Sequence, residues 1–82
     1  MKRDEIILKA NAAMAEEFEV EESLITPEAN IKDTLELDSL NLVDLVAMTQ
    51  QLFKVTIPIA DLSKLQTFEH LYNYIEEHQP AE

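Results

Sequence analysis

The 82-residue sequence contains no cysteine, glycine or tryptophan, and only six Lys and Arg residues stand against 17 Asp and Glu residues. Without cysteine the chain can form no disulfide, no cysteine-based zinc site and no thiol nucleophile. Without glycine it lacks the loops with which Walker A and dinucleotide-binding motifs bring backbone close to phosphate. The net charge of −11 argues against nucleic-acid binding, which needs clustered basic side chains, and favours partners with basic surfaces.

Long hydrophobic runs are also missing. No stretch reaches the roughly 18 to 20 apolar residues that a helix needs to cross a membrane. Residues 1–5 lack the hydrophobic segment of a signal peptide. We therefore expect a cytoplasmic protein without a membrane span. The length fits one small domain over residues 1–82, and the hydrophobic fraction of 46% is ordinary for a folded chain.

Hydrophobic periodicity predicts an all-α four-helix bundle with three longer helices and a short third one. The first helix is expected at residues 3–18, ending near residues 17–19, with a core stripe of Ile7, Ala10, Met14 and Phe18. A short helix is expected at residues 60–65, after the break at Pro58. The final helix begins after a Thr67 cap, and its core stripe is Phe68, Leu71, Tyr72 and Ile75.

Residues 20–37 carry turn-forming and cap-forming side chains without a sustained period, so we expect a long loop between the first two long helices. A single helical turn at residues 27–29 would shorten this loop. Apolar side chains should anchor the loop on the core, namely Leu24, Ile25, Ile31 and Leu35.

The second long helix follows Asp38-Ser39-Leu40, ends at residues 54–56 and has two apolar stripes. The stripe expected to face the core is Leu42, Leu45, Val46, Thr49 and Phe53. The other stripe is rotated by about 100° or more and consists of Leu40, Val43 and Ala47. A helix in a bundle needs only one buried stripe, so the second indicates a surface kept for a partner.

Asp38-Ser39-Leu40 taken alone is the start of a helix, where the Asp38 carboxylate accepts hydrogen bonds from the first amides. The context of this tripeptide is more informative than the tripeptide alone, because the tripeptide follows a long loop and opens the most apolar helix of a strongly acidic chain. The sequence here resembles the acyl carrier protein family over nearly its whole length. The other positions that match the family pattern in register are Ile31, Leu35, Phe53, Ile57-Pro58, Thr67 and Tyr74-Ile75.

The resemblance implies a monomeric carrier with no catalytic residue and no metal site of its own. Ser39 would be the hydroxyl to which a phosphopantetheinyl transferase attaches 4′-phosphopantetheine from coenzyme A, and the arm would carry acyl groups as thioesters. Asp38 and Leu40 would flank this attachment site, with Asp38 capping the helix and contributing to recognition by the transferase. The carrier would serve acyl-transferring or condensing synthase enzymes of fatty-acid, specialised acyl or polyketide biosynthesis. Their basic docking patches would contact Leu40, Val43, Asp44 and Ala47.

The sequence departs from the family pattern at the start of this helix. Most family members have glycine two residues before the aspartate, whereas this chain has Glu36, so the turn must form without glycine's freedom at positive φ. Residues 41–53 contain a single acid, Asp44, where fatty-acid carriers are rich in acids. We therefore expect an atypical or dedicated member with unusual partner enzymes.

Other functions remain open from the sequence. A peptidyl, aminoacyl or D-alanyl carrier would use the same arm for another cargo, although the strong acidity favours an acyl carrier. In a non-carrier helical interaction module, Ser39 would only be the second residue of a capped helix. A hydrolase using Ser39 as nucleophile would need a base and an oxyanion hole within reach. His70 and His78 have no orienting group nearby in the sequence, so we expect structural roles for both.

Overall fold

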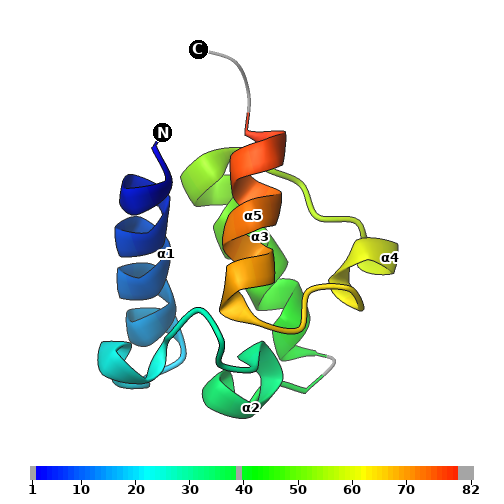
Figure 1. The fold of residues 1–82 in the computed structure, drawn as a ribbon. Helices are drawn as coiled ribbons and strands as arrows, with labels where there is room; N and C mark the ends of the chain where they lie inside the picture. The colour runs from blue at the N-terminus through cyan, green and yellow to red at the C-terminus, as the bar shows by residue number, and fades with distance from the viewer. Residues whose placement is uncertain (1, 39, 80–82) are drawn as a thin grey trace.

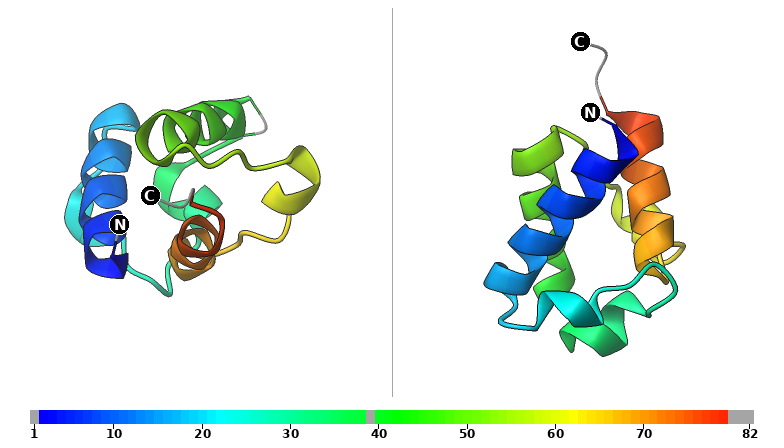
Figure 2. Two further views of the ribbon diagram at one scale, coloured as in Figure 1. Left: turned by 90° about the horizontal axis from the view of Figure 1, so that it is seen from above. Right: turned by 60° about the vertical axis from the view of Figure 1, so that its left-hand side comes forward.

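The computed structural model describes residues 2–38 and 40–79 and confirms the predicted all-α architecture. The longer helices are α1 (Arg3–Glu17), α3 (Asn41–Phe53) and α5 (Phe68–His78), and the short ones are η1 (Glu22–Leu24), α2 (Ile31–Leu35) and α4 (Ile59–Leu62). α1 contacts both α3 and α5. α2 lies at the end of the bundle where α3 and α5 begin, and α4 lies on the side away from α1 (Figures 1 and 2). The part of the chain described contains no strand, only an isolated bridge between Asn30 and Thr67.

The first helix ends at Glu17, as predicted, but its core stripe differs from the prediction at both ends. The buried residues are Ile6, Ala10 and Met14, which are spaced four apart on one face. Ile7 is rotated by about 100° from Ile6 and is only partly buried. Phe18 lies after the last helical residue and is also partly buried, so the expected stripe was wrong at Ile7 and Phe18.

The stripes predicted for the other two long helices are confirmed. α3 buries Leu45, Thr49 and Phe53, with Leu42 and Val46 half-buried beside them. The Thr49 hydroxyl donates a hydrogen bond to the Leu45 carbonyl over 2.9 Å, so this buried polar group is satisfied within the helix. α5 buries all four expected residues, Phe68, Leu71, Tyr72 and Ile75.

The ends of these helices use local capping. α3 stops where Lys54 takes a left-handed conformation with φ 58°. The Thr67 hydroxyl accepts from the His70 amide over 3.3 Å and caps α5, as predicted. The Tyr72 hydroxyl donates to Asn11 Oδ1 and thereby joins α5 to α1.

The segment between α1 and α3 is more ordered than the predicted loop. It contains the short helices η1 and α2, whereas residues 27–29 form only a turn in which the Ala29 amide bonds to the Thr26 carbonyl over 3.1 Å. The expected anchors Ile25, Ile31 and Leu35 are buried. Leu24 is 54% exposed and is not an anchor, because its neighbour Ile25 takes the inward position.

The short helix α4 covers only the first part of the predicted residues 60–65. After Leu62 the chain continues in tight turns, in which the Lys64 amide bonds to the Asp61 carbonyl and the Leu65 amide to the Leu62 carbonyl. These i→i+3 bonds replace the i→i+4 bonds of a longer α-helix. Among the described residues, no helix is long and apolar enough to cross a membrane.

Candidate functional site

The start of α3 is organised by the Asp38 side chain. Asp38 Oδ1 accepts hydrogen bonds from the backbone amides of Leu40 at 3.0 Å and Asn41 at 2.9 Å. The first amides of a helix have no partner within the helix, and its N-terminus carries a partial positive charge, so a carboxylate here is doubly favourable. The predicted capping role of Asp38 is confirmed. Ser39, the expected attachment residue, lies outside the described residues, but both of its sequence neighbours are exposed.

The turn that leads from α2 to this site is unusual in its backbone. Glu36 ends α2 in the left-handed conformation, with φ 53° and ψ 48°. The amides of Glu36 and Leu37 both bond to the Lys32 carbonyl, the latter over 3.0 Å. The turn that was expected to form without glycine therefore does so with a glutamate at positive φ. For a residue with a side chain, this conformation costs roughly 1–2 kcal/mol.

The second apolar stripe of α3 is exposed, as its spacing predicted. Leu40 is 78% exposed and Val43 61% exposed, and Asp44 and Ala47 are also exposed. These residues recur at three-residue and four-residue steps, so they share one side of the helix. We call this set, Leu40, Val43, Asp44 and Ala47, the α3 face. The geometry brings all four expected docking residues together, and docking itself stays a prediction.

Both histidines make structural contacts. His70 Nδ1 faces the backbone amides of Gln66 and Thr67 at 3.3 and 3.4 Å and completes the cap of α5. The His78 ring stacks on Tyr74 with ring centroids 4.0 Å apart and planes at 11°. Within residues 2–38 and 40–79, no group of three or more His, Asp and Glu side chains could hold a metal ion.

Two tyrosine hydroxyls have altered acidity. Burial raises the pKa of Tyr72, although the hydrogen bond to Asn11 and the charge of Arg3 lower it in part. The Tyr74 hydroxyl donates to Asp61 Oδ2 over 3.0 Å. Burial, followed by the hydrogen bond to the Asp61 carboxylate and the charge of that carboxylate, raises the pKa of Tyr74. Both hydroxyls join helices to one another and lie on α5, not at the start of α3.

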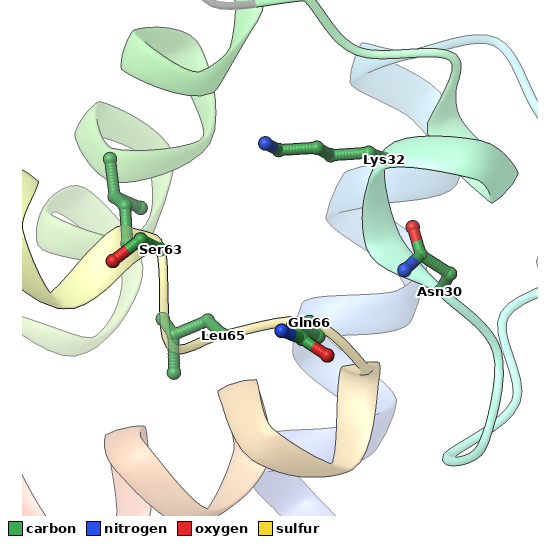
Figure 3. Close-up of a pocket in the computed structure, with 6 residues that line it drawn as sticks. Asn30, Lys32, Ser63, Leu65 and Gln66 are labelled. Carbon is green, nitrogen blue, oxygen red and sulfur yellow. The ribbon is translucent and has the colours of Figure 1, made fainter.

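A cavity of about 240 Å³ lies between α2 and the connection from α4 to α5 (Figure 3). No sequence pattern predicts this cavity, because its walls come from two segments that are far apart in the chain. Backbone hydrogen bonds join these segments, from the Ile31 amide to the Gln66 carbonyl over 2.9 Å and from the Phe68 amide to the Ala29 carbonyl over 3.2 Å. The lining residues are Asn30, Lys32, Leu62, Ser63, Leu65 and Gln66.

Comparison with known proteins identifies a matching family model and several relatives of this chain. Residues 11–75 match the family model described as a phosphopantetheine attachment site. The chain is 40% identical to the acyl carrier protein of Rubrobacter xylanophilus over 81 residues, covering 99% of this chain and 100% of that protein. It is 42% identical to the acyl carrier protein of Thermotoga maritima, covering 90% of this chain and 91% of the relative. The acyl carrier protein of Lactobacillus johnsonii is 34% identical, with 96% and 99% of the two chains covered.

Proposed function

Because the chain belongs to the acyl carrier protein family, we propose that its Ser39 hydroxyl is the attachment point for 4′-phosphopantetheine from coenzyme A. Proteins of this family carry acyl groups and catalyse no reaction themselves. When attached, the arm supplies a terminal thiol that holds acyl groups as thioesters. The observation that carries the assignment to Ser39 is the cap next to it, where Asp38 Oδ1 binds the amides of Leu40 and Asn41. This cap lies within the matched residues 11–75.

The residues next to Ser39 suit a phosphodiester. Asp38 and Leu40 are exposed, so a group attached between them can be reached from solvent by the transferase. The N-terminus of the 13-residue helix α3 favours one negative charge through its free amides and its dipole. Asp38 takes up two of these amides and has the same sign of charge as the phosphate. We therefore assign Asp38 to capping and to transferase recognition, not to binding the phosphate.

The α3 face is the proposed docking surface for the transferase and for the enzymes that load or use the acyl group. Leu40 and Val43 present exposed apolar side chains, and Asp44 offers one carboxylate to a basic group. The net charge of −11 steers the carrier towards enzymes with basic patches before any close contact forms. Weak docking of this kind lets one carrier deliver its tethered cargo to several enzymes in turn.

The setting that fits these features is a cytoplasmic, monomeric carrier made of one domain over residues 1–82. Its relatives are acyl carrier proteins, which supports an acyl cargo over a peptidyl, aminoacyl or D-alanyl one. The family implies fatty-acid biosynthesis as the general context. The acid-poor helix α3 supports a dedicated carrier for a specialised acyl or polyketide pathway rather than the housekeeping fatty-acid one.

The experiment that tests the attachment is intact-mass measurement after incubation with coenzyme A and a broad-specificity phosphopantetheinyl transferase. We expect the mass to increase by one phosphopantetheine group, and the Ser39→Ala variant to stay unmodified. Absence of any adduct, while a known carrier in the same tube is modified, would favour a helical interaction module instead.

A further inference from the structure

The cavity between α2 and residues 62–66 differs in charge from the rest of the molecule. Its lining contains one cation, Lys32, and no carboxylate, in a chain with a net charge of −11. Figure 3 shows the Lys32 side chain extending from α2 into the open space between the two walls. Among the described residues, no carboxylate lies within ion-pair distance of the Lys32 ammonium group, and the same holds for Lys2, Lys9 and Lys54, which do not line the cavity. The cavity therefore presents an uncompensated positive charge.

Two of the other polar side chains of the cavity, Asn30 and Gln66, can donate a hydrogen bond, whereas the Ser63 hydroxyl already donates to the Ala60 carbonyl over 3.1 Å. Asn30 Oδ1 already accepts from the Asp33 amide over 3.0 Å, so the group that its side chain has left to offer is the NH₂. The Gln66 side chain also has an NH₂ group, and no hydrogen bond occupies it within the part of the chain described. Together with the Lys32 ammonium, these groups suit a ligand that only accepts hydrogen bonds, such as a carboxylate.

The volume of the cavity limits the size of its ligand. A volume of about 240 Å³ holds about eight atoms of the size of water, at about 30 Å³ each. A four-carbon or five-carbon chain that ends in a carboxylate is of that size, whereas a long alkyl chain is not. Leu62 and Leu65 form the apolar part of the wall, against which a few methylene groups could pack.

We propose that this cavity binds the free carboxylate end of a short dicarboxylic acyl group carried on the Ser39 arm. The Lys32 ammonium pairs with the carboxylate, the amides of Asn30 and Gln66 donate to it, and Leu62 and Leu65 contact the methylenes. The inference rests on the proposed function, because the acyl group reaches the cavity only when the arm is attached. Ser39 follows the last residue of α2 by four positions in the sequence, so only a short connection separates the attachment residue from the helix that carries Lys32.

The test compares two cargoes of equal length. The chain is loaded by the transferase from succinyl-coenzyme A or from butyryl-coenzyme A, and intact mass first verifies one complete adduct in each sample. If neither adduct forms, the proposed function fails before the cavity is tested. NMR spectra of the two loaded forms then report which backbone amides sense the additional carboxylate. We expect the shift differences to concentrate at Lys32, Ser63 and Gln66, and not on α1.

A matched pair of charge variants separates a specific contact from general electrostatics. Lys32→Gln should abolish these shift differences, whereas Lys64→Gln, which removes a charge outside the lining, should leave them in place. With ¹³C-labelled succinyl cargo, the terminal carboxyl pKa should be roughly 0.5 or more lower in the wild type than in Lys32→Gln. Equal amide shifts with succinyl and butyryl cargo, or an equal carboxyl pKa in the wild type and Lys32→Gln, would overturn the proposal. The comparison of cargoes on the wild-type chain needs no variant to fold.

Discussion

The Tyr74 hydroxyl on α5 donates a hydrogen bond to Asp61 Oδ2 on α4, with 3.0 Å between the two oxygens. A four-residue helix cannot be stable by itself, so contacts of this kind hold α4 in place. Asp61 Oδ1 also lies 3.8 Å from the Lys64 ammonium, so the same carboxylate has a second partner just after α4. The Tyr74–Asp61 bond is therefore a local clamp between α4 and α5.

Replacing Tyr74 with phenylalanine should loosen α4 without unfolding the bundle. Loss of one hydrogen bond is worth about 0.5–1.5 kcal/mol, so the α4 amides should exchange with solvent about twofold to tenfold faster. The amides to follow by hydrogen exchange are those of Leu62, Lys64 and Leu65, all of which are hydrogen-bonded in this region. The Met14 amide on α1 is the internal reference. Unchanged exchange at α4 would mean that the clamp contributes nothing.

The two raised tyrosine pKa values predict a loss of stability at alkaline pH. A tyrosine whose pKa is higher in the folded than in the unfolded state binds its proton more tightly when folded. The stability that such a tyrosine contributes is fully present below about pH 10, the tyrosine pKa in the unfolded state. This stability is lost as the pH rises through the pKa values of Tyr72 and Tyr74 in the folded state. Urea unfolding at a series of pH values should show this decline.

The control for the alkaline decline is the double variant Tyr72→Phe with Tyr74→Phe. It lacks both groups and should lose stability less steeply above about pH 10, although it starts from a lower stability. Lysine deprotonation affects both proteins equally. A variant whose free energy of unfolding falls as steeply as that of the wild type would show that these hydroxyls do not cause the decline.

Glu36→Gly should stabilise the chain. The left-handed conformation of Glu36 costs roughly 1–2 kcal/mol, and glycine takes it freely but loses about 0.5–1 kcal/mol of conformational entropy on folding. The expected net gain is about 0.5–1 kcal/mol in the free energy of unfolding, measured by urea denaturation. Glu28→Gly is the matched control, because Glu28 is exposed and is not among the residues with positive φ. That control should give no gain, and a gain of equal size in both variants would contradict the backbone explanation.

Leu40→Ser should weaken recognition by the transferase. Burying a leucine side chain in an interface is worth about 1.5–3 kcal/mol, so kcat/KM for modification should fall by about tenfold or more. Leu8→Ser is the control, because Leu8 is 67% exposed but lies on α1, away from the α3 face. Both variants should be as stable as the wild type. Equal losses in the two variants would remove the α3 face as the docking surface.

The long helices were predictable because each repeats its apolar spacing over several turns. α5 has four predicted core residues, and all four are buried. α2 was missed because five residues are too few for a helical period, and its position depends on distant backbone, as in the bond from the Ile31 amide to the Gln66 carbonyl. Ile6 was missed for a different reason, since Ile6 and Ile7 are chemically identical and only the position of α3 and α5 selects between them.

The candidate site was predictable in part. The exposure of Leu40 and Val43 and the cap made by Asp38 followed from spacing and from the chemistry of helix ends. The sequence indicated only that the turn at Glu36 must form without glycine. It did not predict the left-handed backbone, since no local pattern forces a glutamate into that conformation. The cavity near Lys32 had no sequence signal, because tertiary backbone bonds bring its two walls together.

Whether Ser39 carries the phosphopantetheine arm can be measured by fragment-ion mapping of the chain after modification. The sequence has three serines, Ser23, Ser39 and Ser63, so each can be replaced by alanine in turn. We expect a single adduct on Ser39, full modification of the Ser23→Ala and Ser63→Ala variants, and no modification of Ser39→Ala. An adduct on another serine, or modification of Ser39→Ala, would contradict this assignment.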